Sequence, residues 1–320
     1  MILNGDVREM LDKIESNSVQ TCITSPPYWN LRDYESDTQL GMEDTPQEFA
    51  SSLVKIFDKV KRVLRKDGTL WLNLGDTYFG AKGGHWDGGN SVTNDETGNK
   101  YRMHKKAPPK HEYLKTKDLV GVPWMVAFAL QQDGWYLRND IIWSKPNGMP
   151  EAVKDRCSKS HEHIFLFAHP ESKGKYYFDY KAIQIDVKKE HIGRYFSNNN
   201  LESRKDNGEF TVNKESQKKY YEKWQEKIKQ GEVPKKNKRD VWHVPTSSFK
   251  GAHFAVFPSK LILPCIMAGS KEGDTVLDIF AGSGTTCKLA QRLSRKWIGI
   301  ELNPKYAEII KQQTSQQSLF

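Results

Sequence analysis

The apolar positions of this chain follow two spacings, one typical of amphipathic helices and the other of short buried strands. Across residues 45–68 the apolar side chains recur at helical spacing and the segment closes with a glycine, so the pattern predicts a helix. Residues 19–24 form a short β-rich run that predicts a strand. We expect the helix over 257–269 to break or bend at Pro264. Further strands are expected over 68–76, 136–146, 161–169, 274–280 and 296–302, and further helices over 122–134, 284–294 and 303–313.

Because strands alternate with helices, the sequence predicts an α/β fold with a mostly parallel, doubly wound sheet. Two polar segments interrupt this pattern. Residues 80–117 are rich in glycine and asparagine and poor in aliphatic side chains, so a long loop is expected there. Residues 188–240 hold 15 Lys and Arg against 9 Asp and Glu and show little apolar periodicity, which indicates an inserted polar module.

Composition limits the kind of protein that this chain can be. With 320 residues, of which 37% are hydrophobic, it is long and apolar enough to bury a core. It has no apolar run near the roughly 20 residues that span a bilayer, and its first residues are too acidic for a secretory signal peptide. Its 4 cysteines lack the paired spacing of disulfide frameworks or zinc sites, so a reducing cytosol is the expected setting. A net charge of +9 favours an anionic partner.

A small-residue turn with the sequence DIFAGSGTT follows the strand predicted over 274–280. Gly282 and Gly284 would let a ligand approach the backbone at the start of a helix. The third glycine of the dinucleotide-binding fingerprint is missing, which argues against a nicotinamide-dependent oxidoreductase. Asp278 before the turn suits a cationic amino group, and Glu301 at the end of the next strand suits two ribose hydroxyls. S-adenosylmethionine carries both groups and no phosphate.

A second turn, TSPPYW, follows the strand predicted over 19–24. Pro26 and Pro27 fix the backbone and remove two N–H donors, so a hydroxyl and a carbonyl acceptor are held rigidly at the strand end. A flat ring with an amino group could stack on Tyr28 and donate hydrogen bonds to the Ser25 hydroxyl and the Pro26 carbonyl. The pattern therefore indicates a site for an amine-bearing ring.

Together, the two turns resemble those of the amino-group DNA methyltransferases, which modify cytosine N4 or adenine N6, in the β arrangement that places SPPY before the glycine motif. The resemblance extends along nearly the whole chain apart from the two polar segments. It implies the Rossmann-like fold of S-adenosylmethionine-dependent methyltransferases, a double-stranded DNA substrate and no metal. The cofactor contacts that it implies are Asp6, Phe257, Pro258, Asp278, Phe280, Ala281, Gly282, Gly284, Thr285, Thr286, Glu301 and Asn303.

The resemblance also divides the chain into a catalytic domain and an insertion. Residues 170–240 would form the inserted target-recognition region. The two signature turns must then meet at the carboxyl ends of adjacent strands. The catalytic domain would comprise 1–169 and 241–320, with its cofactor half from 1–10 and 253–313 and its target-base half from 19–169.

The expected chemistry is direct methyl transfer to an exocyclic amine, with Ser25, Pro26, Pro27 and Tyr28 as the catalytic motif. Hydrogen bonds from the amine to Ser25 and the Pro26 carbonyl would localise the nitrogen lone pair, so no covalent enzyme intermediate is needed. The target base must be flipped out of the duplex to reach this site. Cys265 lies in an apolar helix and is interpreted as a buried thiol, not as the nucleophile of C5-cytosine enzymes.

DNA contacts and partners are expected from the resemblance and the charge pattern. Lysines would attract phosphates, and aromatic side chains would stack on bases. A cognate restriction endonuclease and a second copy of the chain remain open as partners. His161 and His163 share a strand face, as metal ligands can, but no further cluster completes a metal site. The candidate DNA contacts are Trp29, Arg32, Lys145, Lys218, Lys219 and Lys236.

Ser25 bears on which base is modified. Adenine-N6 relatives mostly carry Asp or Asn at the first motif position and cytosine-N4 relatives mostly carry Ser, so the resemblance favours cytosine N4. Adenine N6 stays open, because a neutral hydroxyl is compatible with either amine. Two more distant alternatives are a methyltransferase that acts on RNA or protein amides, whose motif usually begins with Asn, and a non-catalytic DNA-binding protein.

Overall fold

The chain divides into two units, Met1–Asp179 with Asp240–Phe320, and Tyr180–Arg239. No helix in the described ranges is long and apolar enough to cross a membrane. The computed structural model describes residues 1–30, 39–80, 92–94, 100–102, 111–187, 219, 222, 226–233, 235–246 and 257–315.

The first unit is built on an eight-stranded sheet with the order β1-β12-β11-β2-β3-β7-β6-β10. Neighbouring strands run parallel except for β7, which is antiparallel to both β3 and β6. The predicted α/β fold with a mostly parallel sheet is therefore confirmed. The strands are β1 (Ile2–Asn4), β2 (Val19–Thr24), β3 (Leu64–Leu74), β6 (Tyr136–Ser144), β7 (His161–Ala168), β10 (Val241–His243), β11 (Thr275–Asp278) and β12 (Lys296–Glu301).

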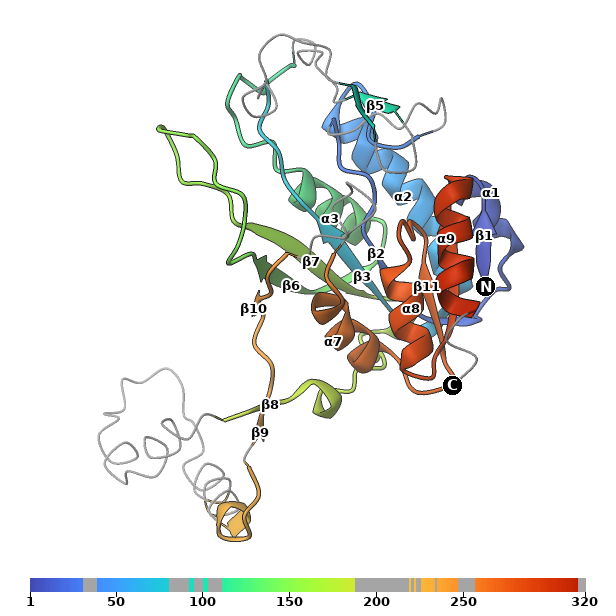
Figure 1. The fold of residues 1–320 in the computed structure, drawn as a ribbon, viewed down its shortest axis with the longest axis vertical. Helices are drawn as coiled ribbons and strands as arrows, with labels where there is room; N and C mark the ends of the chain where they lie inside the picture. The colour runs from blue at the N-terminus through green and yellow to red at the C-terminus, as the bar shows by residue number, and fades with distance from the viewer. Residues whose placement is uncertain are drawn as a thin grey trace. The chain divides into compact units, whose positions relative to one another are not determined.

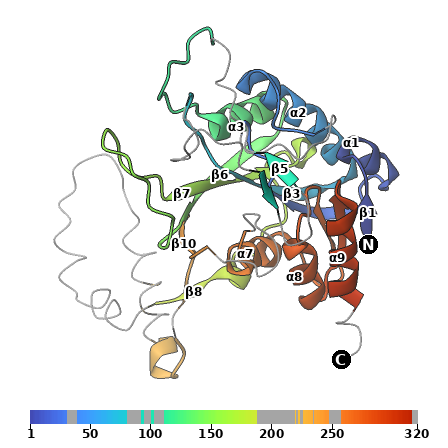
Figure 2. The same cartoon turned by 45° about the horizontal axis from the view of Figure 1, so that its top comes forward.

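Helices cover both faces of this sheet, which makes it doubly wound. Figure 1 and Figure 2 show α1, α2 and α3 on one face and α7, α8 and α9 on the other. Two short 3-10 helices, Leu11–Lys13 and Pro170–Ser172, complete the first unit. The helices are α1 (Val7–Met10), α2 (Pro46–Val63), α3 (Val122–Gln132), α7 (Ser259–Gly269), α8 (Thr285–Arg292) and α9 (Pro304–Ser315).

The α2 helix differs from the sequence prediction at its carboxyl end. The α2 helix ends at Val63, earlier than expected, because Leu64 already begins β3 and pairs with Val19 of β2. Leu64 is buried in the same core as the apolar residues of α2, so its position in the sequence continues their helical spacing. In the structure, however, it is a strand residue. The expectation for Pro264 was a break or a bend, and of these the break is absent, because α7 continues through Pro264 to Gly269.

The two polar segments are described only in part. Within the expected loop, β4 (Val92–Asn94) and β5 (Lys100–Arg102) pair antiparallel. The second unit contains a 3-10 helix (Lys181–Ile183) and an antiparallel pair formed by β8 (Ile185–Asp186) and β9 (Lys235–Lys236).

The boundary of the insertion also differs from the expectation, because residues 170–179 belong to the first unit. The amide of Tyr177 donates to the carbonyl of Asp67 at 2.8 Å, and the amide of Asp179 donates to the carbonyl of Ala268 at 2.9 Å. These backbone hydrogen bonds attach the segment to β3 of the eight-stranded sheet and to α7.

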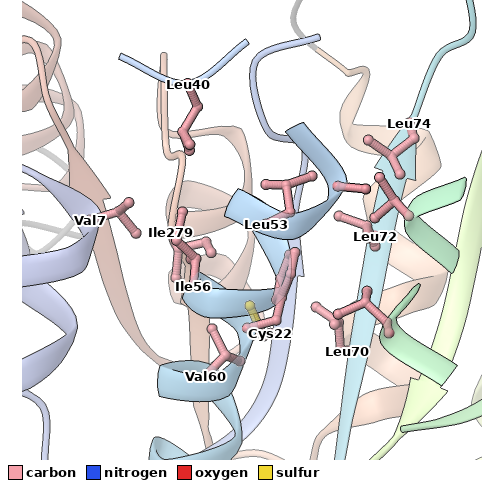
Figure 3. Close-up of a cluster of buried hydrophobic side chains, with 14 of the residues drawn as sticks. Val7, Cys22, Leu40, Leu53, Ile56, Val60, Leu70, Leu72, Leu74 and Ile279 are labelled. Carbon is pink, nitrogen blue, oxygen red and sulfur yellow. The ribbon is translucent and has the colours of Figure 1, made fainter. Parts of the chain in front are cut away.

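The core between α2 and the sheet is formed by aliphatic side chains that the helical spacing predicted. Leu53, Ile56 and Val60 of α2 belong to one buried cluster with Leu70 and Leu72 of β3, and Figure 3 shows this cluster. All five side chains are at most 1% exposed. Burial of each such side chain contributes about 1.5–3 kcal/mol.

We expect Leu53→Ala to lower the free energy of unfolding by about 2–5 kcal/mol, because it leaves a cavity in this core. Lys55→Ala, an exposed position on the same helix, should change it by less than about 0.5 kcal/mol. Urea unfolding of both variants measures the difference. Equal losses would contradict the described packing of α2.

Candidate active site

The two signature turns leave the sheet from adjacent strands. β2 and β11 pair in parallel, with Thr21 opposite Val276 and Cys22 opposite Leu277. Beyond these pairs, the hydroxyl of Thr24 donates to Oδ1 of Asp278 at 2.8 Å, although the two residues are 254 positions apart. The prediction that the turns meet at the carboxyl ends of adjacent strands is confirmed.

This meeting point is also where the strand order reverses. From β2 the chain continues to β3 on one side, and from β11 it continues to β12 on the other side. In doubly wound sheets such a reversal opens a crevice outside the carboxyl ends of the strands, where ligands bind. The topology therefore places both turns at the usual ligand site of this architecture.

Asp278 is a buried carboxylate at the base of the glycine turn, only 1% exposed. Its Oδ1 accepts hydrogen bonds from Thr24 and from the amide of Phe280, at 2.8 and 3.2 Å. Among the described residues, Oδ2 has no hydrogen-bond partner of good geometry, and neither has the nearby Thr286 hydroxyl. Burial raises the pKa of Asp278 to about 6, although the Thr286 and Thr24 hydroxyls and the Phe280 amide act in the opposite direction. A donor on a bound ligand would satisfy this oxygen.

Glu301 ends β12 and holds the glycine turn from the other side. Its Oε2 accepts from the amide of Gly282 at 2.8 Å, and its Oε1 accepts from the amide of Asn303 at 2.9 Å. Burial raises the pKa of Glu301 to about 7 and the nearby Asp278 carboxylate adds to this, whereas the backbone amides of Asn303, Gly282 and Leu302 act against it. A carboxylate offers about four acceptor positions, so the backbone amides leave acceptor capacity for a ligand hydroxyl.

The two glycines of the turn have different roles. Gly282 has φ +50°, and an added Cβ would meet no atom closer than the Phe280 carbonyl at 4.0 Å, so its backbone faces open space. At Gly284, with φ +78°, an added Cβ would lie 2.7 Å from Cγ1 of Ile310 in α9. The amide of Gly284 donates to the carbonyl of Ala281 at 2.7 Å. Gly284 therefore makes room for the packing of α9, a role that the sequence did not indicate.

Among the other candidate cofactor contacts, the side chains of Asp6 and Asn303 accept hydrogen bonds from neighbouring residues. The Asp6 carboxylate caps α1 by accepting from the Arg8 amide at 2.8 Å, and it also pairs with the Arg8 guanidinium. The side-chain oxygen of Asn303 accepts from the amide of Lys305 at 2.9 Å and caps α9. Phe257 and Pro258 directly precede α7, Ala281 follows the glycine-turn strand, and Thr285 begins α8.

Tyr28 of the TSPPYW turn lies in a polar cluster that the sequence did not predict. Its hydroxyl donates to Oε2 of Glu162 at 2.6 Å and lies 3.4 Å from Oδ1 of Asn73. Ser25 and Tyr28 are partly exposed, whereas Pro26 is buried. In the sequence, Glu162 stood out only as the residue between two histidines, because nothing local indicates that its strand runs antiparallel toward Tyr28.

The candidate DNA contacts divide into three groups. Trp29 is only 3% exposed, and its indole N–H donates to the carbonyl of Glu43 at 2.9 Å, so it belongs to the core and not to a DNA-facing surface. Lys145 pairs with Glu162 inside the polar cluster. Lys219 is exposed and Lys236 lies in β9, whereas Arg32 and Lys218 lie outside the described residues.

Comparison with known proteins agrees with this arrangement. The DNA methylase family of N6 and N4 methyltransferases matches residues 19–312. The type II methyltransferase M.Cfr9I of Citrobacter freundii is 42% identical over 308 residues, which cover 96% of this chain and 85% of that protein. M.SmaI, a type II methyltransferase of Serratia marcescens, is 42% identical over 312 residues, covering 97% and 89%. The chain belongs to the DNA methylase family.

Solved structures of low sequence identity share the fold of this DNA methylase. The PvuII DNA methyltransferase, named as cytosine-N4-specific, has a TM-score of 0.60 at 18% identity, covering 98% of this chain and 85% of that chain. TTHA0409 of Thermus thermophilus, in complex with S-adenosyl-L-methionine, has a TM-score of 0.56 at 21% identity, covering 99% and 93%. The Rossmann-like methyltransferase fold is thus confirmed.

Two other candidate sites in this DNA methylase are the Cys265 thiol and the strand that carries His161 and His163. Cys265 is fully buried, and its thiol lies 3.6 Å from the carbonyl of Leu261, as expected for a structural thiol. The His163 ring is bound to Asp140 at 2.9 Å. In the part of the chain that the structure describes, no group of three or more His, Cys, Asp or Glu side chains could hold a metal ion.

We expect Thr24→Val to lower the free energy of unfolding by about 1.5–3 kcal/mol at pH 8, because it removes a hydrogen bond to an ionised buried carboxylate. Below the pKa of Asp278 the carboxyl is neutral, so the loss at pH 5 should be below about 1 kcal/mol. Denaturant unfolding at both pH values tests this. Thr24→Ser keeps the hydroxyl and is the control, and an equal loss at pH 5 and pH 8 would contradict the assignment.

Proposed function

We propose that this DNA methylase transfers the methyl group of S-adenosylmethionine to the N4 amine of a cytosine flipped out of duplex DNA. The observation that carries this proposal is the pairing of β2 with β11, which brings the TSPPYW turn beside the glycine turn. Two substrates held at these turns would lie next to each other. Holding the reacting atoms in line can lower the barrier by about 7–11 kcal/mol.

The glycine turn fits S-adenosylmethionine, which supplies an electrophilic methyl group when bound. The unpartnered Oδ2 of Asp278 is buried and suits a cationic donor, and the backbone of Gly282 has room beside it. The remaining acceptor capacity of Glu301 suits the ribose hydroxyls. The S-adenosylmethionine complex of TTHA0409, which has the same fold, supports this assignment.

At the catalytic turn, the chain would bind and orient the amine. The Ser25 hydroxyl and the Pro26 carbonyl would accept its two hydrogen bonds, which localises the lone pair on nitrogen. Pro26 and Pro27 would hold these acceptors rigidly. The ring of Tyr28 would stack on the flipped base, an interaction worth about 1–3 kcal/mol.

Cytosine N4 is the preferred target for two reasons. Ser25 occupies the first motif position. The PvuII enzyme, whose fold this chain shares, is named as cytosine-N4-specific. Adenine N6 is the alternative, since the matching family includes both activities. Membership of a DNA methylase family disfavours RNA or protein amides as the substrate.

The remaining assignments concern DNA and partners. We propose that Lys219 and Lys236, in the second unit, attract DNA phosphates, together with Arg32 and Lys218. The names of M.Cfr9I and M.SmaI, type II methyltransferases, support a place in a restriction–modification system with a cognate endonuclease.

Incubation with unmethylated duplex DNA and S-adenosylmethionine, followed by digestion to nucleosides and mass spectrometry, should give N4-methylcytosine. Ser25→Ala and Tyr28→Ala should each lower the rate by at least about 10-fold, since both would contact the base. N6-methyladenine would support the alternative, and the absence of any methylated base would reject DNA as the substrate.

Affinity for S-adenosylmethionine should depend on pH through the two buried carboxylates. Because their pKa values are raised, to about 6 for Asp278 and about 7 for Glu301, a cationic ligand must displace protons at low pH. Calorimetry should therefore give an affinity at least about fivefold lower at pH 5.5 than at pH 7.5. Asp278→Asn should weaken S-adenosylmethionine binding at pH 7.5 and make the affinity less dependent on pH. If the affinity of the parent protein were the same at both pH values, a role of the two carboxylates in binding would be contradicted.

A further inference from the structure

A hydrogen-bonded cluster surrounds the hydroxyl of Tyr28. We propose that Glu162 is a positioning residue that holds the Tyr28 ring in place for the target base, and that Lys145 holds Glu162 instead of contacting DNA. This inference rests on the proposed role of Tyr28 as the surface on which the base stacks.

Three strands bring the cluster together at one edge of the sheet. Because β7 is antiparallel to β3 and β6, its first residues lie beside the last residues of these strands. Glu162 is opposite Trp143 of β6, and its neighbour His163 is opposite Leu74 of β3. Glu162 therefore lies at the edge of the sheet where β2 ends and the chain continues to Tyr28.

The Tyr28 ring is constrained along its whole length. An added Cβ at Gly75 would lie only 2.6 Å from Cε2 of Tyr28, so the ring packs against the backbone at the end of β3. At its far end, the hydroxyl donates to Oε2 of Glu162 at 2.6 Å. The side-chain amide of Asn73, through Nδ2, donates to the same oxygen at 3.2 Å and to the carbonyl of His163 at 3.0 Å, which fixes the acceptor from a second side.

The charge of Glu162 is compensated within the cluster. Its side chain is 12% exposed, and Oε1 pairs with the ammonium of Lys145, whose side chain is 20% exposed. The same ammonium lies 4.3 Å from the centre of the Trp143 ring. With the Lys145 ammonium on Oε1, the hydrogen bond that the phenol donates to Oε2 is part of a charge-assisted cluster, and such hydrogen bonds are stronger than those between neutral groups. Lys145 is thereby occupied on two sides.

A fixed ring lowers the cost of capturing a flipped base. If the phenol were untethered, the ring would have to be ordered each time a base enters, and this cost would oppose the productive geometry. A small misplacement of a reacting group can reduce a rate by about 100-fold. Loss of the tether should therefore lower the rate of methyl transfer and leave cofactor binding unchanged.

The test is a double-mutant cycle on the full-length protein, with single-turnover methyl transfer to duplex DNA as the measurement. Glu162→Ala and Tyr28→Phe should each lower the rate by about 10-fold or more, and the double variant should be no slower than Tyr28→Phe alone. Glu162→Gln keeps an acceptor oxygen and should recover most of the rate. The affinity for S-adenosylmethionine, measured by calorimetry, should match that of the parent in every variant.

Asp140→Asn is the matched control, because it weakens a similar partly buried carboxylate pair, with His163, on the neighbouring strand without touching Tyr28. Its rate should stay within about twofold of the parent. Rate losses that multiply in the double variant would overturn the positioning role, as would an Asp140→Asn loss as large as that of Glu162→Ala. A parent that methylates no DNA refutes the proposed function itself, whereas an active parent with multiplying losses refutes only the role of Glu162.

Discussion

The parallel pairing of β2 with β11 is the constraint on which the site depends. It joins two segments that lie 254 residues apart, and the hydrogen bond from Thr24 to Asp278 closes the contact just beyond the paired residues. The first strand of the chain is held in the same way, since β1 pairs with β12 near the carboxyl terminus. Because both halves of the site are assembled from distant parts of the chain, neither exists before the sheet is complete.

At the glycine turn, a carboxylate is buried at a cost in stability, and the same carboxylate can bind a ligand. An ionised carboxylate such as Asp278 is costly to bury, and among the described residues its Oδ2 has no hydrogen-bond partner of good geometry, although the Thr286 hydroxyl is nearby. A cationic ligand at this place would recover the lost interaction. Functional sites commonly sacrifice stability in this way, and the surrounding core compensates for the loss.

The reversed strand β7 gives the site a second property. In an entirely parallel sheet, only the ends of strands and the loops after them would reach the carboxyl edge. Since β7 runs the other way, it brings the beginning of a strand to that edge, and with it Glu162 beside the TSPPYW turn. A rigid element thus supports a turn that would otherwise depend on its prolines alone.

The sequence by itself determined the type and order of the main elements and the two signature turns, because periodicity and turn chemistry are local properties of the chain. It could not determine where α2 ends or that Trp29 is buried. Whether Leu64 is a helix or a strand residue, and whether Trp29 is buried, depends on contacts with residues far away in the sequence. Only the tertiary structure decided that Gly284 makes room for Ile310 and that Lys145 is paired with Glu162. Contacts of this kind depend on which strands become neighbours and in which direction they run, and local spacing carries no information about either.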